Sequence, residues 1–439
     1  MNQTSIELQY AQHIETLQHR AREALGREAI DGLIIHSGQL HYQFLDDNPY
    51  PFKVSPQFKA WLPVVDNPNS WLIVDGVNKP KLIFYLPVDF WHKVPKVPDA
   101  FWTDFFDITY LKKANMVEKH LPYDLSKYAY LGEHVEVAKA LGISLVNPDR
   151  VMHYMHYHRA FKTDYELNCM REANKIAVRS HKAAERAFLS GKSEFEINQA
   201  YLSAAVQSEE QMPYGNIVAL NENASILHYM VLDKTAPEIH RSFLIDAGAS
   251  YSGYAADITR TYCAENNQFN ALIVAVDSLT QQLVGKLIPG IEYVDIHKQA
   301  FVGIANILHD FKLINLSPEG ILDKGIVGTF FPHGVGHMLG LQVHDVAGHV
   351  ANDRGTPKPA PTEHPFLRCT RTVEARQVFT IEPGVYFIDS LLAELKSTEN
   401  SKYINWDVVD EFRPYGGVRI EDNVIVHAEK NENMSRDNW

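Results

Sequence analysis

Two aspartates, Asp246 and Asp257, lie in the segment SFLIDAGASYSGYAADITRTY, where two apolar β-type runs flank a short glycine-containing turn. A turn centred near Tyr251–Ser252 would place the two aspartates directly opposite each other on a hairpin. Opposed strand residues have Cβ atoms roughly 4.5–5.5 Å apart, so two carboxylates there repel unless a cation lies between them. This spacing suits a pair of divalent ions about 3.5–4 Å apart. Taken alone, the pair is equally consistent with solvated aspartates on an exposed hairpin, because Asp is common near turns.

Three histidines lie in the segment FFPHGVGHMLGLQVHD, at His333, His337 and His344. The first two are four residues apart, as in a zinc-binding helix. Pro332 and two intervening glycines argue against a helix, and the glutamate of the HExxH motif is missing. A glycine-rich loop would instead let the backbone approach a ligand closely.

Two glutamates lie within or next to apolar, strand-like runs. Glu382 ends such a run just before Pro383-Gly384, and Glu421 lies inside the run GGVRIED. Either residue alone is more often exposed or paired locally, since Glu is rarely buried without a partner. Together with the apolar-flanked aspartate pair, the two glutamates indicate a carboxylate-rich metal site. Arg419 should orient the ligands of this metal site without binding the metal itself. The alternative is an exposed arginine on the strand.

In this order, the residues resemble the pita-bread metallopeptidase family, which includes methionine aminopeptidase, aminopeptidase P and prolidase. The resemblance extends over the whole chain, including FLDDNPYPFKVSPQFKAWLP near the N-terminus, and it is closest to the bacterial Xaa-Pro dipeptidase branch that includes organophosphorus acid anhydrolases. It implies an α+β fold with an N-terminal creatinase/prolidase-like α/β domain at residues 1–155 and a pita-bread catalytic domain at 156–439. The metal ligands that it implies are Asp246, Asp257, His337, Glu382 and Glu421.

The composition of this ligand set favours two ions rather than one. Four carboxylates contribute four negative charges, which two divalent cations would balance. A single zinc site normally takes three or four ligands, mostly His or Cys. Carboxylate-rich ligation suits harder ions, so Mn²⁺ is expected, with Co²⁺ or Zn²⁺ as substitutes. Two such ions would lower the pKa of a bridging water.

The resemblance also implies roles for residues around the metals. Glu382 would transfer the proton of the attacking water, His344 would stabilise the oxyanion, and His333 would handle substrate or protons. An Xaa-Pro amide has no N–H, so a basic residue must orient the free proline carboxylate instead. The implied substrate-binding positions are His228, Arg368, Arg419, Tyr214, Leu227, Tyr293 and Val343. The last four of these could equally be plain core residues.

Two residues of the N-terminal domain, Asp47 and Trp91, resemble positions that close the active site of a neighbouring subunit. They imply a homodimer and a substrate no longer than a dipeptide. The implied activity is cleavage of Xaa-Pro dipeptides with a C-terminal proline, with promiscuous hydrolysis of organophosphate triesters and fluorophosphates. Aminopeptidase P, which shares both domains, is the main alternative. Methionine aminopeptidase needs no domain like residues 1–155, and a metal-free creatinase-like enzyme or binding module would lack metal ligands.

Composition agrees with a two-domain globular enzyme. The chain has 439 residues, 45% of them hydrophobic and 22% charged, and a net charge of −13. The negative charge argues against nucleic acid and anionic membranes as partners. No stretch reaches 18 apolar residues, and three distant cysteines without CxxC spacing predict reduced thiols in a cytoplasmic protein. Cys369 is expected to be inert, although flanking arginines could lower a thiol pKa.

Hydrophobic periodicity predicts the main elements. In the N-terminal part these are a helix at Ile6–Ala29, a strand at Asp31–His36, apolar runs at Ala60–Val65, Ser70–Val74 and Lys81–Leu86, a strand at Tyr128–Leu131 and a helix at Glu133–Leu141. A helical stretch from Arg150 to about Gly191 follows, and a capping box at Ser193–Glu196 opens the next helix. The remaining predicted elements are helices at Phe269–Leu287 and Val294–Phe311 and strands at Gly215–Tyr229, Gln377–Phe387 and Val418–His427.

Overall fold

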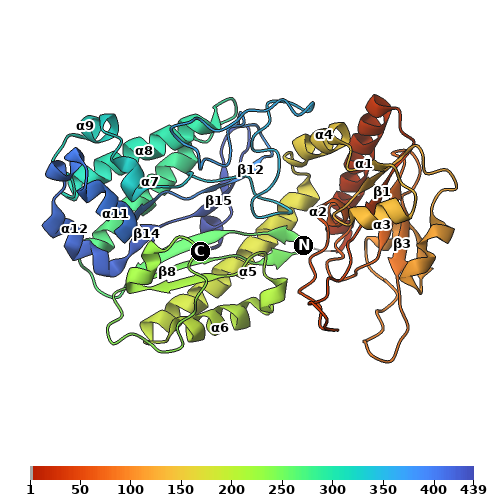
Figure 1. Ribbon diagram of the computed structural model, residues 1–439, viewed down its shortest axis with the longest axis horizontal. Coiled ribbons are helices and arrows are strands. Elements are labelled where there is room, and N and C mark those ends of the chain that lie inside the picture. The colour runs from red at the N-terminus through yellow and green to blue at the C-terminus, as the bar shows by residue number, and fades with distance from the viewer. Residues whose placement is uncertain (1–2) are drawn as a thin grey trace. The chain divides into compact units, whose positions relative to one another are not determined.

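The computed structural model describes residues 3–439, which divide into two compact units (Figure 1). The first unit runs to Cys169 and includes the short segment Asn352–Thr356, and the second comprises Met170–Ala351 and Pro357–Trp439. The short segment contacts the rest of the first unit, and its Asp353 accepts a hydrogen bond from Arg27 Nη1 at 2.9 Å. Among residues 3–439, no helix combines the length and apolar character that crossing a bilayer needs.

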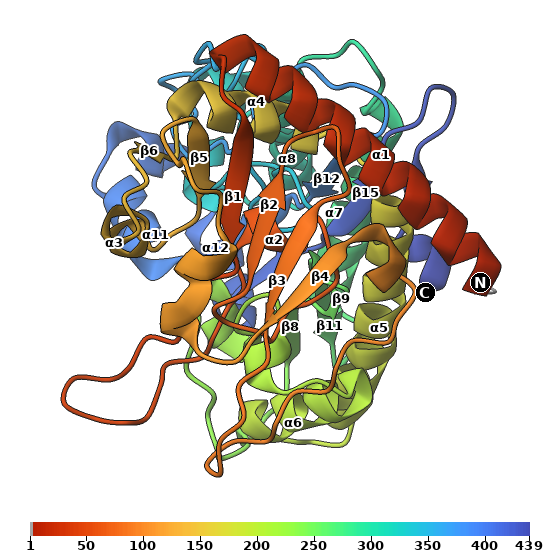
Figure 2. The ribbon, with the colours of Figure 1, turned by 90° about the vertical axis from the view of Figure 1, so that its right-hand side faces the viewer.

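The first unit is built on a six-stranded mixed sheet (Figure 2). Its strands, in spatial order, are β4 (Asp107–Leu111), β3 (Lys81–Tyr85), β2 (Trp71–Val74), β1 (Gly32–His36), β5 (Tyr128–Leu131) and β6 (Leu145–Val146). β2 runs antiparallel to both of its neighbours, and the other pairs are parallel. Ile34, Trp71, Ile83 and Tyr130 form the core on one face of the sheet. The helices are α1 (Gln3–Glu28), α2 (Pro56–Lys59), α3 (Val135–Ala140) and α4 (Asp149–Arg159).

The apolar run Ala60–Val65 follows α2 as a turn and is buried through Trp61 and Leu62. One prediction for this unit needs correction. The helical stretch from Arg150 breaks after Arg159, and α5 (Asp164–Leu189) begins anew. Thr163 and Glu166 explain the break as a capping box: the Glu166 carboxylate accepts the Thr163 N–H at 2.8 Å, and Thr163 Oγ1 accepts the Glu166 N–H at 3.4 Å.

The second unit carries short strands in several small sheets. One sheet has the order β11 (Ile258–Cys263), β8 (Ser242–Ala247), β7 (Ile217–Leu220), and another has β12 (Val378–Ile381), β15 (Asp422–Ile425), β16 (Glu432–Asn433). Two-stranded sheets join β9 (Ser250–Tyr251) to β10 (Tyr254–Ala255) and β13 (Gly384–Tyr386) to β14 (Gly417–Arg419). A bridge between Thr259 and Glu421 connects the first sheet to the second half of the unit.

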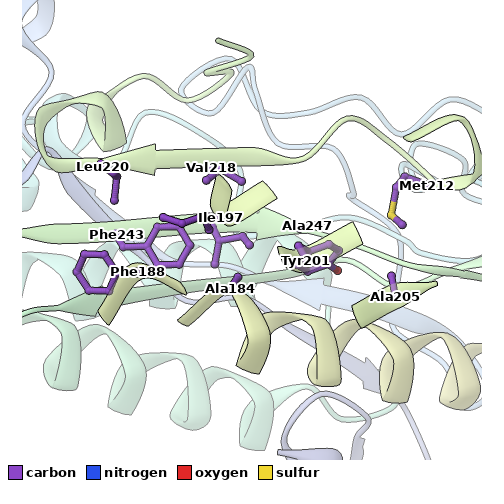
Figure 3. Packing of buried hydrophobic residues seen from close by; sticks show 11 residues of the cluster. Ala184, Phe188, Ile197, Tyr201, Ala205, Met212, Val218, Leu220, Phe243 and Ala247 are labelled. Carbon is purple, nitrogen blue, oxygen red and sulfur yellow. The ribbon is translucent and has the colours of Figure 1, made fainter. Parts of the chain in front are cut away.

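Helices flank these strands (Figure 1). α5 and α6 (Glu194–Ala205) send Phe188, Ile197 and Tyr201 against Phe243 and Val218 of β8 and β7 (Figure 3). The predicted capping box of α6, Ser193 with Glu196, is confirmed. The remaining helices are α7 (Gln268–Lys286), α8 (Tyr293–Asp310), α9 (Pro318–Asp323), α10 (Val327–Phe330), α11 (Asp389–Lys396) and α12 (Trp406–Phe412).

The hairpin that carries the two aspartates has a register different from the predicted one. Ser252 and Gly253 are the turn residues, and both have positive φ, as a type I′ turn requires. Asp246 therefore pairs with Thr259, and the same register places Asp257 opposite residue 248. The aspartates are diagonal neighbours rather than directly opposed. They still share one face, because the register differs from the prediction by an even number of residues.

The predicted late strands are each interrupted at a glutamate. The run Gln377–Phe387 divides into β12 and β13 at Glu382-Pro383, where proline cannot donate a ladder hydrogen bond. The run Val418–His427 divides into β14 and β15 around Ile420 and Glu421. Both glutamates thus lie at strand ends, where their side chains can turn toward the hairpin.

Candidate metal centre

Five acidic and histidine side chains meet where β8, β11, β12, β14 and β15 converge. Asp246 lies in β8, Asp257 immediately precedes β11, and Glu421 lies between β14 and β15. His337 belongs to a loop that pairs with β12 through the neighbouring bridge from Met338 to Phe379, and Glu382 follows β12 directly. Each residue comes from a different strand or loop.

Tyr214 joins the two aspartates. Its hydroxyl lies 2.7 Å from Asp246 Oδ1 and within hydrogen-bond distance of Asp257 Oδ1. Gly248 makes room for it, since a Cβ there would lie 2.9 Å from the Tyr214 ring. Tyr214 was predicted to be a pocket-wall or core residue, and its role as a pocket wall stays a prediction. The contact of its hydroxyl with the two carboxylates was not predicted.

The His337 ring is oriented by the backbone. Its Nδ1 donates to the Met338 carbonyl at 3.0 Å, so Nε2 faces the carboxylates. Nε2 lies 3.4 Å from Asp257 Oδ2 and 3.6 Å from Glu382 Oε1. These separations exceed normal hydrogen-bond lengths and are wide enough for a shared cation. Gly336 lets this loop pack tightly, because a Cβ there would collide with the Thr380 carbonyl. The predicted close backbone approach is therefore made to β12.

Two threonines that the sequence analysis did not identify hold the glutamates. Thr259 Oγ1 donates to Glu421 Oε2 at 2.6 Å, and Thr380 Oγ1 donates to Glu382 Oε1 at 3.2 Å. Thr380 also accepts the His337 N–H at 3.0 Å. A sequence signal was present: each threonine is two residues from an acidic candidate, Asp257 or Glu382, and so shares its face in an extended chain.

Arg419 is buried beside the cluster, with 5% of its surface exposed, which excludes the exposed-strand alternative. Its Nη2 donates to Asp246 Oδ2 at 2.6 Å, its Nη1 to the Tyr386 hydroxyl at 2.9 Å and its Nε to Thr259 Oγ1 at 3.2 Å. One guanidinium thus holds a carboxylate, a phenol and a hydroxyl in fixed relation.

Burial makes this group of like charges costly. It raises the pKa of Glu382 to about 7 and, with the nearby charge of Asp257, raises the pKa of Glu421 well above its ordinary value. Burial raises the pKa of Asp246 as well, although Arg419 opposes the rise. Burial also acts on Asp257, but His337 and Tyr214 outweigh it and lower the pKa of that carboxyl. Without a cation, the positive groups of the protein therefore do not balance the negative charge of these four carboxylates.

The donor set fits a metal ion. One ligand atom each from Asp257, His337 and Glu421 lies within 4.8 Å of the others, and all three residues are buried. Within residues 3–439, the buried Oε1 of Glu421 has no hydrogen-bond partner. A buried carboxylate oxygen without a partner costs free energy, and a bound cation would supply the missing interaction.

Two further histidines are held as neutral rings near the cluster. His333 Nδ1 donates to the Gly334 carbonyl at 2.8 Å, and its Nε2 lies 2.8 Å from the Tyr386 hydroxyl. Burial and the charge of Arg419 lower the pKa of His333 to about 3. The ring of His344 packs edge-on against His337 at 4.4 Å between centroids, and burial with the His337 charge lowers its pKa to about 4.

Two of the predicted basic residues of the substrate site, Arg368 and His228, lie close enough to affect the pKa values of these rings. The charge of Arg368 contributes to the lowered pKa of His344, and that of His228 lowers the pKa of both His333 and His344, after burial in each case. Arg368 and His228 are exposed, so both are accessible to a ligand.

The remaining predicted substrate positions differ in their surroundings. Leu227 and Val343 are half-buried. Tyr293 is fully buried and donates its hydroxyl to the Thr380 carbonyl at 2.9 Å, which fits the core alternative. Asp47 and Trp91 are exposed in the first unit. Their role toward a neighbouring subunit stays a prediction.

The cysteines form no part of this centre. All three are free thiols. Cys369 is buried, and burial raises its pKa to about 12 in spite of the nearby Arg371. The expectation that it is inert agrees with this environment.

Comparison with known proteins identifies the family to which the chain belongs. The model of metallopeptidase family M24 matches residues 168–428, and the chain belongs to this family. A second model, the N-terminal domain of Xaa-Pro dipeptidase, matches residues 8–157. The chain is 67% identical over 432 residues to an Xaa-Pro dipeptidase from Pseudoalteromonas atlantica, a match that covers 98% of each chain. It is 58% identical to an Xaa-Pro dipeptidase from Shewanella denitrificans over 98% of this chain and 97% of the relative. Both of these sequence relatives are named Xaa-Pro dipeptidase.

Solved structures agree on the architecture. Aminopeptidase P from E. coli with the inhibitor Pro-Leu superposes with a TM-score of 0.74 at 19% identity, covering 99% of this chain and 95% of that chain. A zinc-substituted form of the same enzyme with product gives a TM-score of 0.71 at 20% identity, covering 99% of this chain and 96% of that chain. At such identity the likeness establishes the fold alone. The α+β architecture with a pita-bread domain, expected from the resemblance, is confirmed.

Proposed function

We propose that this chain is an Xaa-Pro dipeptidase that holds two divalent cations with Asp246, Asp257, His337, Glu382 and Glu421. The observation that carries the proposal is the buried cluster itself, in which Glu421 Oε1 has no partner within residues 3–439. The relatives at 58–67% identity, all named Xaa-Pro dipeptidase, support the substrate class.

The number of ligands supports two ions, because a single zinc site normally takes three or four ligands and five are proposed here. The carboxylates contribute four negative charges and Arg419 one positive charge, so one divalent cation leaves one negative charge and two leave one positive charge. A ligand set of carboxylate oxygens with one imidazole and no thiolate favours Mn²⁺, with Co²⁺ or Zn²⁺ as substitutes.

Bound cations would supply Lewis-acid polarisation and water activation at neutral pH. The chain's own residues would perform the remaining tasks. Glu382, next to His333 and His337 in the cluster, is proposed to take a proton and deliver it to the departing proline nitrogen. His344, whose ring packs edge-on against His337, is proposed to donate a hydrogen bond to the developing oxyanion. His333, fixed by Gly334 and Tyr386, is suited to positioning substrate, because both of its ring nitrogens are already engaged.

Recognition of proline would depend on Arg368. A proline at the second position provides no amide N–H, so its free carboxylate is the group left for orientation. The guanidinium of Arg368 is exposed and lies close enough to affect His344, next to the proposed oxyanion site. Guanidinium–carboxylate pairing is frequently bidentate, which would fix the direction of the dipeptide.

Hydrolysis of Leu-Pro and Leu-Pro-Gly by Mn²⁺-loaded protein tests this function. A dipeptidase cleaves the first and leaves the tripeptide intact. Preferred cleavage of Leu-Pro-Gly would instead indicate aminopeptidase P activity, and cleavage of neither would refute both. Glu374→Gln, in a loop before β12, is a control that should retain activity, whereas Asp246→Asn should lose activity and bound metal together.

The same centre is proposed to hydrolyse organophosphate triesters and fluorophosphates. A tetrahedral phosphoryl centre resembles the tetrahedral intermediate of amide hydrolysis, so a site complementary to that intermediate can accept it. Fluoride and aryloxide leaving groups need less protonation than a proline nitrogen. Fluoride release from diisopropyl fluorophosphate should disappear in Asp246→Asn and be inhibited competitively by an Xaa-Pro dipeptide. Release unchanged in that variant would show that the activities do not share a site.

A homodimer is also proposed, with Asp47 and Trp91 closing the neighbouring subunit's site. Large apolar side chains are exposed in the same segments of the first unit: Phe44 at 90%, Leu45 at 91%, Phe90 at 85% and Trp91 at 78%. Apolar groups exposed to this extent favour burial against a partner. Light scattering should give twice the chain mass, and Trp91→Ala should alter KM. An active monomer would contradict the proposal.

A further inference from the structure

A buried carboxylate outside the metal centre binds a single segment of the chain through four hydrogen bonds. Glu194, the first residue of α6, is 1% exposed. Its Oε1 accepts from the Leu220 N–H and from Asn223 Nδ2, both at 2.9 Å. Its Oε2 accepts from the Tyr229 hydroxyl at 2.8 Å and from the Asp233 N–H at 2.9 Å. All four donors belong to residues 220–233.

Starting α6 does not require this carboxylate. The helix is capped by Ser193 and Glu196, which form the reciprocal capping box. A glutamate in the first turn gains from the helix dipole, but it gains this while exposed to solvent, as Glu196 is. Burial of Glu194 costs desolvation, which its four hydrogen bonds offset. The bonds to residues 220–233 are therefore the reason for the buried position.

The segment that Glu194 holds has little structure of its own. After the 3₁₀ turn Asn221–Ser225, no helix or strand forms before His240. Tyr229 is nearly buried and also accepts a hydrogen bond from Asn223 Nδ2 at 3.0 Å, which closes the network. The Glu194 carboxylate thus fixes the beginning, the middle and the end of the segment.

This segment reaches the metal centre. Met230 packs against Gly215, where a Cβ would lie 2.6 Å from Met230 Cε, and Gly215 directly follows Tyr214, which contacts both aspartates. His228 immediately precedes Tyr229, the residue that donates to Glu194. Within residues 3–439, no hydrogen bond or ring contact is found for the His228 imidazole, so the backbone of the segment determines its position.

We infer that Glu194 is a positioning residue for substrate binding: by fixing residues 220–233, it sets the place of His228 at the rim of the metal centre. The inference rests on the proposed dipeptidase function for its kinetic consequence. Since Glu194 contacts none of the proposed metal ligands, its loss should weaken the binding of the dipeptide and leave metal content unchanged.

Glu194→Gln tests the inference with little change of volume. The amide oxygen can still accept two hydrogen bonds, but the amide nitrogen cannot accept from Tyr229 and Asp233. KM for Leu-Pro is expected to rise roughly tenfold, the effect of weakening one hydrogen bond to a charged group. The kcat value should stay within about threefold of wild type. Glu196→Gln, the same change in the same helical turn, is the control and should leave KM unchanged.

A double-mutant cycle identifies the path of the effect. If Glu194 acts through His228, then Glu194→Gln combined with His228→Ala should have the KM of His228→Ala alone, within about twofold. KM effects that multiply would overturn the inference. Tyr229→Phe keeps the carboxylate and removes one donor, so it should raise KM less and in the same direction, and it serves if Glu194→Gln folds poorly.

Hydrogen exchange separates this inference from the proposed activity. Peptides covering residues 226–233 should exchange faster in Glu194→Gln than in wild type, without substrate and at equal metal content. Unchanged exchange would refute the positioning role. If wild-type protein fails to cleave Leu-Pro while the exchange difference is found, the proposed function fails and the structural role of Glu194 stands.

Discussion

Replacement of Arg419 by alanine tests how far one buried guanidinium organises the metal centre. The change removes the 2.6 Å hydrogen bond to Asp246 Oδ2 and the contacts with Tyr386 and Thr259. Asp246 would keep only its contact with Tyr214, so its carboxylate would be free to rotate away from the cation.

The size of the effect follows from the contacts. A hydrogen bond to a charged group contributes about 1.5–3 kcal/mol. Loss of a residue that orients a metal ligand typically lowers metal affinity about 10–100-fold, which corresponds to roughly 1.4–2.8 kcal/mol. The two ranges agree, so loss of the bond to Asp246 suffices to account for the expected decrease. Arg419→Lys keeps the charge but cannot make all three contacts, and it should fall between wild type and alanine.

Calorimetric titration of metal-stripped protein with Mn²⁺ measures the affinity, and kcat/KM for Leu-Pro at saturating Mn²⁺ measures the residual orientation effect. Arg413→Ala is the matched control. Arg413 pairs with Asp389 at 2.7 Å, but its side chain is 45% exposed, so its loss should cost less than about 1 kcal/mol of stability. Metal affinity of Arg419→Ala within twofold of wild type would refute the orienting role.

Three further outcomes are expected. Burial and the charge of His134 lower the pKa of His36 to about 3, from 6.5. As the pH falls, His36 is therefore protonated in the unfolded chain before it is protonated in the folded protein. The free energy of unfolding, fully present above about pH 6.5, should be lower by about 2 kcal/mol at pH 5. Urea denaturation at the two pH values should show a smaller decrease for His36→Gln. Native protein should titrate one thiol with a disulfide reagent, half-buried Cys263, and three in urea, since Cys169 and Cys369 are buried. Chelation should abolish dipeptidase activity, and Mn²⁺ should restore it in wild type but not in Glu421→Gln, whose carboxamide is a weaker ligand; equal recovery in both would remove Glu421 from the ligand set.

Local patterns predicted the elements that local forces determine. The α6 capping box, strand β5 and helices α7 and α8 were predicted nearly at their observed bounds, because caps and periodicity act within a few residues. The Thr163–Glu166 capping box was equally readable and was missed. The helical stretch predicted from Arg150 to about Gly191 extended across it.

Contacts between distant segments could not be predicted in the same way. The hairpin register depends on which two residues adopt positive φ, and Ser252 with Gly253 were displaced by one residue from the predicted turn. The contact of Tyr214 with both aspartates also could not be predicted, because it depends on the absence of a side chain at Gly248. The four bonds to Glu194 join residues that are 26–39 positions apart.

The sequence by itself determined which side chains are available for chemistry, because four carboxylates and a histidine next to apolar runs are already costly to bury without a cation. It also determined the face that the two aspartates share, since strand alternation survives an even change of register. Only the tertiary structure decided that Thr259, Thr380 and Arg419 orient these groups and that Glu421 Oε1 has no protein partner within residues 3–439. The physical reason is that the identity of a ligand is a local property of the sequence. Its orientation, and whether it finds a hydrogen-bond partner, depend on strands that meet only when the chain folds.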